Sequence, residues 1–310
     1  MQPFFTICIP VYNREKLITR TLTSIIEQRF EDYEIIIVDD GSTDRSIDII
    51  ETFIKKNPTI NIKLETKKNG GKHTALNVGI KKAEGKFFII LDSDDYLAKD
   101  ALISAYNLIE KYNQQYGIIG KSAYQDSKII GEQFNKDIKF MDYIDFHFGK
   151  GFTIRGNRFG DCFECNKTGL LKKYEFPEDP RTKFVPESYI FDRIGLEDRL
   201  LCTNSVFLIK EYQIDGITNN YGDFIKKNYI GFLYKYVDEL ENIFVQRRVG
   251  VLPKIYSWSK YWNLKKINTQ DENPTVKKIT FLGAIVKFSL PIILFIKKYV
   301  KHNNDKLDIQ

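Results

Sequence analysis

The sequence has few of the features that mark secreted or nucleic-acid-binding proteins. Only 4 of its 310 residues are cysteines, too few for a disulfide framework in a chain of this length, which fits a reducing compartment. Met1 is followed almost directly by an apolar, strand-like segment, so no signal peptide is visible. The net charge of +6 is modest, and the basic residues do not form an RNA-binding pattern with aromatic residues. We therefore expect a cytoplasmic protein without a nucleic-acid partner.

What the sequence does contain is an ordinary globular composition with many aromatic residues. Hydrophobic residues make up 43% and charged residues 28% of the chain, as in soluble proteins. The aromatic share of 14% is high. It favours a core rich in Phe and Tyr, with carbohydrate or membrane contacts as the alternative. A length of 310 residues allows one large domain or two smaller ones.

Strand-like and helix-like segments alternate through the first 112 residues. Short apolar runs typical of buried strands occur at 4–9, 34–38, 60–64 and 87–91. Apolar residues at helical spacing occur at 15–28, 45–56, 73–83 and 99–112. This order predicts an α/β fold with a mostly parallel sheet, right-handed crossovers and helices on both faces. From residue 221 onward the pattern is helical.

The most informative polar cluster follows the run at 87–91 and contains Asp92, Asp94 and Asp95. Three carboxylates at the mouth of a buried strand are costly unless positive charge lies beside them. A divalent cation such as Mg²⁺ or Mn²⁺ supplies that charge and leaves coordination positions for phosphate oxygens. We therefore predict a phosphate-bearing ligand held through a metal at the carboxyl edge of the sheet. The alternative is a loop of solvated acids in which Asp95 begins the next helix.

Four motifs end the predicted strands or begin the helices that follow them, at 10–13, 38–42, 70–77 and 91–95. They read PVYN, VDDGS, GGKHTALN and LDSDD, and together they resemble the family 2 glycosyltransferases. The resemblance is strong over about the first 120 residues and weaker to about residue 218. It implies an enzyme of the GT-A fold with a nucleotide-sugar donor, in a family of which many members build bacterial cell-surface polysaccharides.

The resemblance also implies a division of the chain. A GT-A catalytic domain would occupy residues 1–215, and a helical C-terminal region would occupy 216–310. Within the catalytic domain, residues 1–120 would bind the nucleotide sugar. Residues 121–215 would bind the acceptor and supply the catalytic base.

The first two motifs imply a pocket for the base of the donor. In the family pattern, Pro10, Tyr12 and Asn13 line this pocket, with a ring to stack on the base and backbone groups to bind it. Asp39 accepts a hydrogen bond from N3–H of the base, which favours uracil and hence a UDP-sugar. Helix capping is the alternative for Asp39.

The LDSDD motif contains the DXD pattern of the family. The resemblance implies that Asp92 contacts the ribose, that Ser93 lies in the donor site, and that Asp94 ligates Mn²⁺ or Mg²⁺ on the diphosphate. The metal would act as a Lewis acid that neutralises the charge developing on the leaving group.

The third motif begins a helix and carries Lys72, His73 and Asn77. Lys72 and His73 would bind donor phosphates or sugar hydroxyls at the helix N-terminus. A solvated lysine and a partly buried histidine are the alternatives. Asn77 would fix either the loop or the donor sugar.

Family 2 enzymes invert the anomeric centre by in-line attack, so one carboxylate must take the proton of the acceptor hydroxyl. The family usually supplies it from a Glu-Asp pair before an apolar helix, and residues 184–193 resemble that region with Ser188 in place of the Asp. We predict Glu187 as the base, with Asp192 as the second candidate. We expect the Glu-Asp pair at 197–198 to form a turn. Asp161 is expected to face the sugar or acceptor, with a loop salt bridge as the alternative.

Two further features have simple interpretations. Cys162 and Cys165 form a lone CxxC without a second pair, so we do not expect zinc. Residues 279–296 are apolar but contain Lys287, which is costly in a membrane span. Peripheral contact of residues 277–301 with the cytoplasmic face of a membrane fits this stretch. Packing on the core of the protein is the alternative.

From these residues and the resemblance, we expect a metal-dependent inverting hexosyl- or N-acetylhexosaminyltransferase. It would move a sugar from a UDP-sugar to a glycan or lipid-linked saccharide acceptor in cell-surface polysaccharide synthesis. A sugar nucleotidyltransferase is one alternative, but the segment at 10–14 is not its Gly-rich loop. A non-catalytic nucleotide-sugar-binding module is the other, and Ser188 is the feature in its favour.

Overall fold

The structure is a computed structural model that describes residues 2–135, 138–149, 158–211, 221–267, 273–277, 279–280 and 282–287. The described part forms a nine-stranded sheet with the strand order β3-β2-β1-β4-β8-β6-β9-β5, and β7 also pairs with β9. The strands are β1 (Phe5–Val11), β2 (Tyr33–Asp39), β3 (Ile62–Thr66), β4 (Phe87–Ile90), β5 (Tyr96–Leu97), β6 (Gly117–Tyr124), β7 (Lys139–Met141), β8 (Cys162–Lys167) and β9 (Leu200–Lys210).

The predicted α/β fold is confirmed, and its parallel order holds in the first half of the chain. Strands β3, β2, β1 and β4 are parallel neighbours, and β1 and β2 are buried along their whole length. The second half of the sheet is mixed, because β8 runs antiparallel to both β4 and β6, while β9 is parallel to β6. The carboxyl ends of β1, β2, β4 and β9 and the start of β8 therefore lie at one edge of the sheet.

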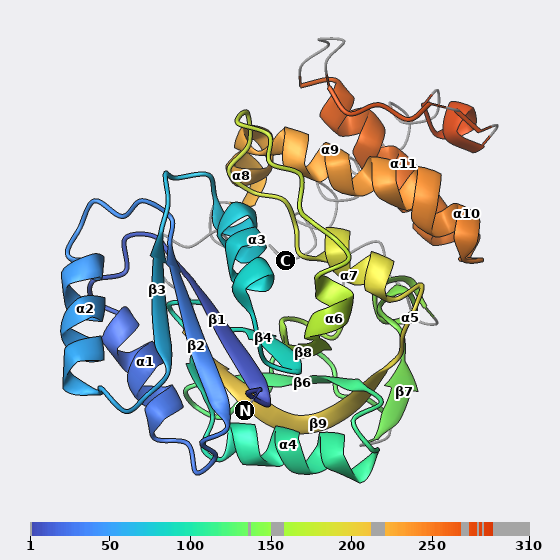
Figure 1. The fold of residues 1–310 in the computed structure, drawn as a ribbon. Helices are drawn as coiled ribbons and strands as arrows, with labels where there is room; N and C mark the ends of the chain where they lie inside the picture. The colour runs from blue at the N-terminus through green and yellow to red at the C-terminus, as the bar shows by residue number, and fades with distance from the viewer. Residues whose placement is uncertain are drawn as a thin grey trace, which may run out of the picture.

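Helices cover both faces of the sheet, as predicted (Figure 1). One face is covered by α1 (Ile18–Ile26), α2 (Ser46–Lys56) and α4 (Ala101–Lys111), which contribute Leu22, Ile50 and Leu102 to one buried cluster. The other face is covered by α3 (Lys72–Lys82), α5 (Tyr143–Phe148), α6 (Thr168–Leu171) and α7 (Ser188–Ile194). Burial of both sheet faces explains why the strands read as continuous apolar runs.

The C-terminal helices form a separate packed group beside α3 and α7 (Figure 1). They are α8 (Tyr221–Lys227), α9 (Tyr229–Asp238), the π-helical turn η2 (Glu239–Ile243), α10 (Phe244–Gln246) and α11 (Val251–Lys265). Their core contains Leu233, Trp258 and Tyr261. The group is joined to α7 by Arg193, whose guanidinium lies 2.7 Å from the Asp238 carboxylate.

Residues 282–287, within the apolar stretch 279–296, are helical and pack on this group. The indole N–H of Trp262 donates to the carbonyl of Gly283 at 3.0 Å, and Val286 is buried in the same core. For these residues the structure agrees with packing on the protein's own core. Residues 288–301 of the expected membrane contact lie outside the described residues. No helix in the described part of the chain is long and apolar enough to cross a membrane.

One local prediction is wrong, since Asp95 does not begin a helix. The short strand β5 follows it, and α4 begins only at Ala101, after Asp100 in the left-handed conformation. The predicted turn at 197–198 is confirmed by two backbone hydrogen bonds to the Ile194 carbonyl. The CxxC cysteines lie on β8 in clusters on opposite faces of the sheet, so their thiols do not converge.

Candidate active site

Two cavities lie side by side at the carboxyl edge of the sheet, and both are lined by Lys72 and Asp92. The larger cavity has a volume of about 600 Å³ and the smaller cavity about 280 Å³. The larger cavity is lined by residues from the first three motifs, the acidic cluster and the C-terminal helices: Pro10, Val11, Tyr12, Arg14, Asp40, Asn69, Gly71, Lys72, Asp92, Ser93, Asp94, Lys183, Phe184, Phe224, Lys227 and Asn228. All four sequence motifs therefore contribute residues to the larger cavity.

The entrance of the larger cavity carries an exposed aromatic ring. Tyr12 is 45% exposed, although it directly follows a strand that is wholly buried. Pro10 and Ser93 line the same cavity. An accessible ring beside a pocket is suited to stacking on a planar base.

Asp39 and Asn13 support this cavity from behind and are not among its lining residues. One oxygen of the buried Asp39 carboxylate accepts the backbone N–H groups of Gly41 and Ser42, both at 3.0 Å. Its Oδ1 has no hydrogen-bond partner in the described part of the structure. Asn13 accepts the N–H of Thr43 at 2.8 Å. Asp39 does not cap α2, since Asp44 accepts the first amide of that helix.

The acidic cluster lies where the two cavities meet. Single carboxylate oxygens of Asp92, Asp94 and Asp95 all lie within 4.8 Å of one another. The ammonium of Lys72 is 2.5 Å from Asp92, and that of Lys210 is 2.7 Å from Asp95. The mutual repulsion of the carboxylates is therefore offset in part by lysines of the protein itself, which supply some of the positive charge that the sequence led us to expect here.

The two lysines set the charge state of the cluster. Burial raises the pKa of Asp92, but Lys72 and Lys210 outweigh it and lower the pKa to about 2. The pKa of Asp95 is raised to about 6 by burial and by the charges of Asp92 and Asp94, in spite of Lys210. The lysines thus favour the ionised form of Asp92, whereas burial and the neighbouring carboxylates disfavour the ionised form of Asp95.

Asp94 is the carboxylate with the best fit to a metal. Its side chain is 27% exposed, and its nearest cation is Arg14 at 3.6 Å, a much looser pair than those of its neighbours. Divalent cations bind through one or two carboxylates and complete their shell with phosphate oxygens. The oxygen donor set and the opening of Asp94 into the larger cavity fit Mg²⁺ or Mn²⁺ carried on a diphosphate.

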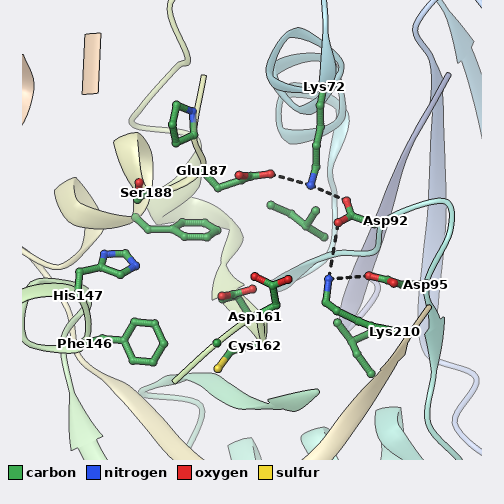
Figure 2. A pocket seen from close by; sticks show the side chains of 16 residues that line it. Lys72, Asp92, Asp95, Phe146, His147, Asp161, Cys162, Glu187, Ser188 and Lys210 are labelled. Atoms are coloured by element: carbon green, nitrogen blue, oxygen red, sulfur yellow. Dashed lines mark hydrogen bonds and ion pairs between the residues drawn. The ribbon is translucent and has the colours of Figure 1, made fainter. Parts of the chain in front are cut away.

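Glu187 and Asp161, the residues expected to serve as base and to face the sugar or acceptor, both line the smaller cavity. Glu187 directly precedes α7, and its carboxylate lies 2.7 Å from the ammonium of Lys72. Figure 2 shows the Lys72 ammonium between the carboxylates of Glu187 and Asp92. The second candidate base, Asp192, does not line either cavity and is bound instead to His147 at 2.6 Å.

His73 and Asn77 line neither cavity. His73 is buried against Phe176, and burial lowers the pKa of its ring to about 4. Asn77 donates to the carbonyl of Phe176 and accepts its N–H, both at 2.9 Å. These contacts agree with the alternatives of a buried histidine and an asparagine that fixes the loop.

The sequence reasoning missed several lining residues. Lys210 ends β9 and Glu164 lies in β8, so long-range strand pairing brings both to the cavity. Burial raises the pKa of Glu164 to about 8, with Asp161 and Glu187 adding to the effect. Phe224, Lys227 and Asn228 reach the larger cavity from α8 and its end. The sequence around these residues carries no motif that marks them as lining a cavity.

Comparison with known proteins identifies the family of this arrangement. The model of "Glycosyl transferase family 2" matches residues 6–165. The poly(ribitol-phosphate) beta-glucosyltransferase of Bacillus spizizenii is 43% identical over 143 residues, which cover 44% of this chain and 22% of that protein. The poly(ribitol-phosphate) beta-N-acetylglucosaminyltransferase TarS of Staphylococcus aureus is 38% identical over 120 residues, covering 37% of this chain and 20% of TarS. The aligned part of the chain thus spans about a fifth of the length of these relatives.

Solved structures share the fold at lower sequence identity. The structure of S. aureus TarS 1-349 with UDP-GlcNAc superposes with a TM-score of 0.57 at 20% identity and covers 85% of this chain and 81% of that one. The mannosyltransferase PcManGT of Pyrobaculum calidifontis, in complex with GDP-Man and Mn²⁺, has a TM-score of 0.54 at 16% identity and covers 95% and 81%. The predicted GT-A architecture is confirmed by these likenesses.

Proposed function

This chain belongs to glycosyl transferase family 2, and we propose that it transfers a sugar from a UDP-sugar to a saccharide acceptor with inversion of the anomeric centre. The observation that carries the proposal is the meeting of two cavities at Lys72 and Asp92. One is large and has an accessible Tyr12 ring, and the other contains the carboxylate of Glu187. A donor in the first would present its sugar to an acceptor in the second.

The larger cavity has groups suited to each part of UDP. Tyr12 and Pro10 would hold the uracil, and the unpartnered Asp39 Oδ1 would accept its N3–H after a small rearrangement of the wall. Asp92 would bind the ribose, and Lys72 would bind the diphosphate. His73 and Asn77 would act only indirectly, by supporting α3 and the loop at Phe176.

Asp94 would hold Mn²⁺ or Mg²⁺ against the diphosphate. The bound metal would supply Lewis-acid stabilisation of the leaving group. The structure of PcManGT contains Mn²⁺ beside GDP-Man, which supports a metal in this fold without fixing its identity here.

Glu187 would act as the general base. An acceptor hydroxyl in the smaller cavity would attack C1 of the donor sugar, and the bond from C1 to the phosphate oxygen would break with its electron pair leaving on UDP. The proton of the attacking hydroxyl would pass to the Glu187 carboxylate. Lys72, 2.7 Å from that carboxylate, would orient it toward the junction of the two cavities. Asp161, in the same cavity, would orient the sugar or the acceptor.

The two alternatives are less well supported. A non-catalytic module has no need of a base, yet Glu187 lies in a cavity that adjoins the donor pocket. A sugar nucleotidyltransferase would need a Gly-rich loop after β1, where this chain has Pro10 and Tyr12.

Named relatives act on poly(ribitol-phosphate), so cell-surface polysaccharide synthesis is the setting we propose. Peripheral membrane contact through residues 277–301 is also proposed, and flotation with anionic vesicles tests it.

The direct test is release of UDP from a panel of UDP-sugars in the presence of Mn²⁺. We expect release with at least one donor, and a loss of roughly 100-fold in Asp94→Asn or after chelation, because the charge on the leaving group is then left without the metal. Asp126→Asn, at an exposed turn that lines neither cavity, is the matched control and should behave as wild type. Undiminished release in chelator would contradict the metal's role, and no release from any UDP-sugar would contradict the donor.

A further inference from the structure

A histidine–aspartate pair forms the wall of the smaller cavity farthest from the acidic cluster. His147 lies on α5 and lines the cavity, and its Nδ1 is 2.6 Å from the carboxylate of Asp192 on α7. Asp192 is 1% exposed, so its carboxylate is reached through His147 and not through solvent. The pair is built from two helices that are distant in sequence, and the proposed transfer step does not use it.

The pairing fixes which ring nitrogen faces the cavity. A carboxylate can only accept a hydrogen bond, so Nδ1 of the neutral ring carries the proton, and Nε2 keeps a lone pair. Nε2 makes no hydrogen bond to the described residues. Figure 2 shows the ring edge of His147 turned toward the cavity, on the side of Glu187 away from Lys72. A hydrogen-bond acceptor is therefore presented on the acceptor side of the proposed base.

Aromatic rings flank this acceptor atom. Phe146 and Phe191 line the same cavity. His147 itself packs against Tyr143 and edge-on against Phe146, so its orientation is held by packing as well as by Asp192. An apolar ring surface beside a single polar atom suits a pyranose, which has an apolar C–H face and hydroxyls around its rim.

The charge of the cavity disfavours an anion. Its lining contains two lysines, Lys72 and Lys210, against the carboxyl groups of Asp92, Asp95, Asp161 and Glu187, besides Glu164, whose raised pKa of about 8 keeps it protonated at neutral pH. Both lysines already lie within 4 Å of carboxylates in the cluster. A phosphate on the acceptor end would meet like charges in a confined space, at a cost that a neutral sugar avoids.

We propose that His147, oriented by Asp192, binds a hydroxyl of the acceptor, and that the acceptor end is an uncharged, hydroxyl-bearing sugar ring and not a phosphate-bearing polyol. This inference rests on the proposed function, because it assigns the second substrate of that site. Glu187 takes the proton of the attacking hydroxyl, and Nε2 of His147 accepts a hydrogen bond from a second hydroxyl of the same ring. No covalent step passes through His147.

The test is binding of acceptor analogues to the full chain loaded with UDP and Mn²⁺, measured by saturation-transfer NMR titration. The probes are the methyl β-glycosides of glucose, galactose and N-acetylglucosamine, with ribitol 5-phosphate as the charged polyol. We expect at least one glycoside to bind and ribitol 5-phosphate not to compete with it. His147→Ala and Asp192→Asn should each weaken glycoside binding about tenfold, the effect of one lost hydrogen bond.

Two controls separate this effect from loss of folding. UDP affinity should be unchanged in both variants, and Asp145→Asn, on the same helix with a half-exposed side chain, should bind glycoside as wild type. His147→Gln keeps a polar acceptor and should bind the glycoside more tightly than His147→Ala does. It is the second variant of the test if Asp192→Asn does not fold.

Three results would overturn the inference: binding of ribitol 5-phosphate in preference to the glycosides, no binding of any glycoside, or unchanged glycoside affinity in the His147 variants. A transfer rate that collapses at saturating acceptor in His147→Gln would also overturn it, because His147 would then be the base. Failure of the proposed function would give a different result from failure of this inference, because the wild type would then release no UDP from any UDP-sugar.

Discussion

Lys72 connects the two halves of the site, since its ammonium lies within 2.7 Å of two carboxylates that we assign to different substrates. On one side it lowers the pKa of Asp92, and on the other it contacts the proposed base. A donor phosphate bound near Lys72 would compete with both carboxylates for its ammonium, so donor binding would loosen the contact between Lys72 and the proposed base.

Glu187 gives the first prediction at this scale. Glu187→Gln should lower the rate of sugar transfer by roughly 10²–10⁴-fold, because the amide cannot take the proton, while UDP affinity stays near that of wild type. The rate is measured as transfer to the glycoside that binds best, at saturating UDP-sugar. Glu175→Gln, at an exposed position, should transfer normally. Full activity in Glu187→Gln would move the base to another residue, with Asp161 the next in the cavity.

Glu164 gives a prediction for the pH dependence of stability. Burial raises its pKa from 4.5 to about 8, so between these values the folded state holds a proton that the unfolded chain has lost. The free energy of unfolding of the wild type should therefore fall as pH rises through this window. Glu164→Gln removes this contribution, so its stability relative to wild type should increase from about pH 5 to about pH 8.

Urea denaturation at both ends of the window measures this difference. Glu175→Gln is again the control, and its stability should follow the wild type at each pH. A constant difference between Glu164→Gln and wild type across the window would contradict the raised pKa.

The site residues that the sequence predicted lie in local motifs, whereas those that it missed reach the site through strand pairing over a long distance in the chain. Asp92, Asp94 and Tyr12 lie in motifs directly after strands, where local pattern and strand order suffice to place them. Lys210 and Glu164 reach the site only because β9 and β8 pair with β6 far along the chain. Their local sequences carry no mark of that pairing, so only the tertiary structure reveals them.

At the scale of elements, α7 is held between the sheet and the C-terminal helices. Arg193 on α7 binds Asp238 at the end of α9 through two hydrogen bonds of 2.7 and 3.0 Å, and Asp238 is 5% exposed. The same helix presents Phe191 to the smaller cavity and directly follows Glu187. The C-terminal helices therefore help to position the proposed base.

Arg193→Met should show this coupling. Removing the guanidinium leaves the buried Asp238 carboxylate without its cation and with the amide of Asn242 as its remaining partner among the described residues, which should lower the free energy of unfolding by about 2–3 kcal/mol. Lys226→Met breaks the exposed pair with Asp223 and should leave stability unchanged. Both are measured by chemical denaturation. Equal stabilities of the two variants would show that α7 does not depend on this contact.

Element boundaries also show where local reasoning stops. The strand and helix patterns predicted α1 to α4 within a few residues, because amphipathic spacing and buried apolar runs are local signals. Asp95 was misplaced because the two-residue β5 gains its stability by pairing with β9 and not from its own sequence. Asp95 also forms an ion pair with Lys210 at the end of β9.

At the scale of the whole molecule, the sheet and the C-terminal helices enclose one site between them. The predicted boundary near residue 215 does not separate the site from the helices, since Phe224, Lys227 and Asn228 line the larger cavity. Asn228 also accepts the backbone N–H of Lys183 at 3.0 Å, which ties the helices to the segment that precedes the base. We infer that the helical region belongs to the donor site.

The central claim is a single displacement at the anomeric carbon, with the donor on the Lys72 side and the acceptor on the Glu187 side. The most direct measurement is the anomeric configuration of the first-formed product, read by proton NMR after transfer from an α-linked UDP-sugar to a neutral methyl glycoside. The account predicts a β-linked product. An α-linked product would contradict it, because retention requires a different chemical path from the one that Glu187 and its cavity support.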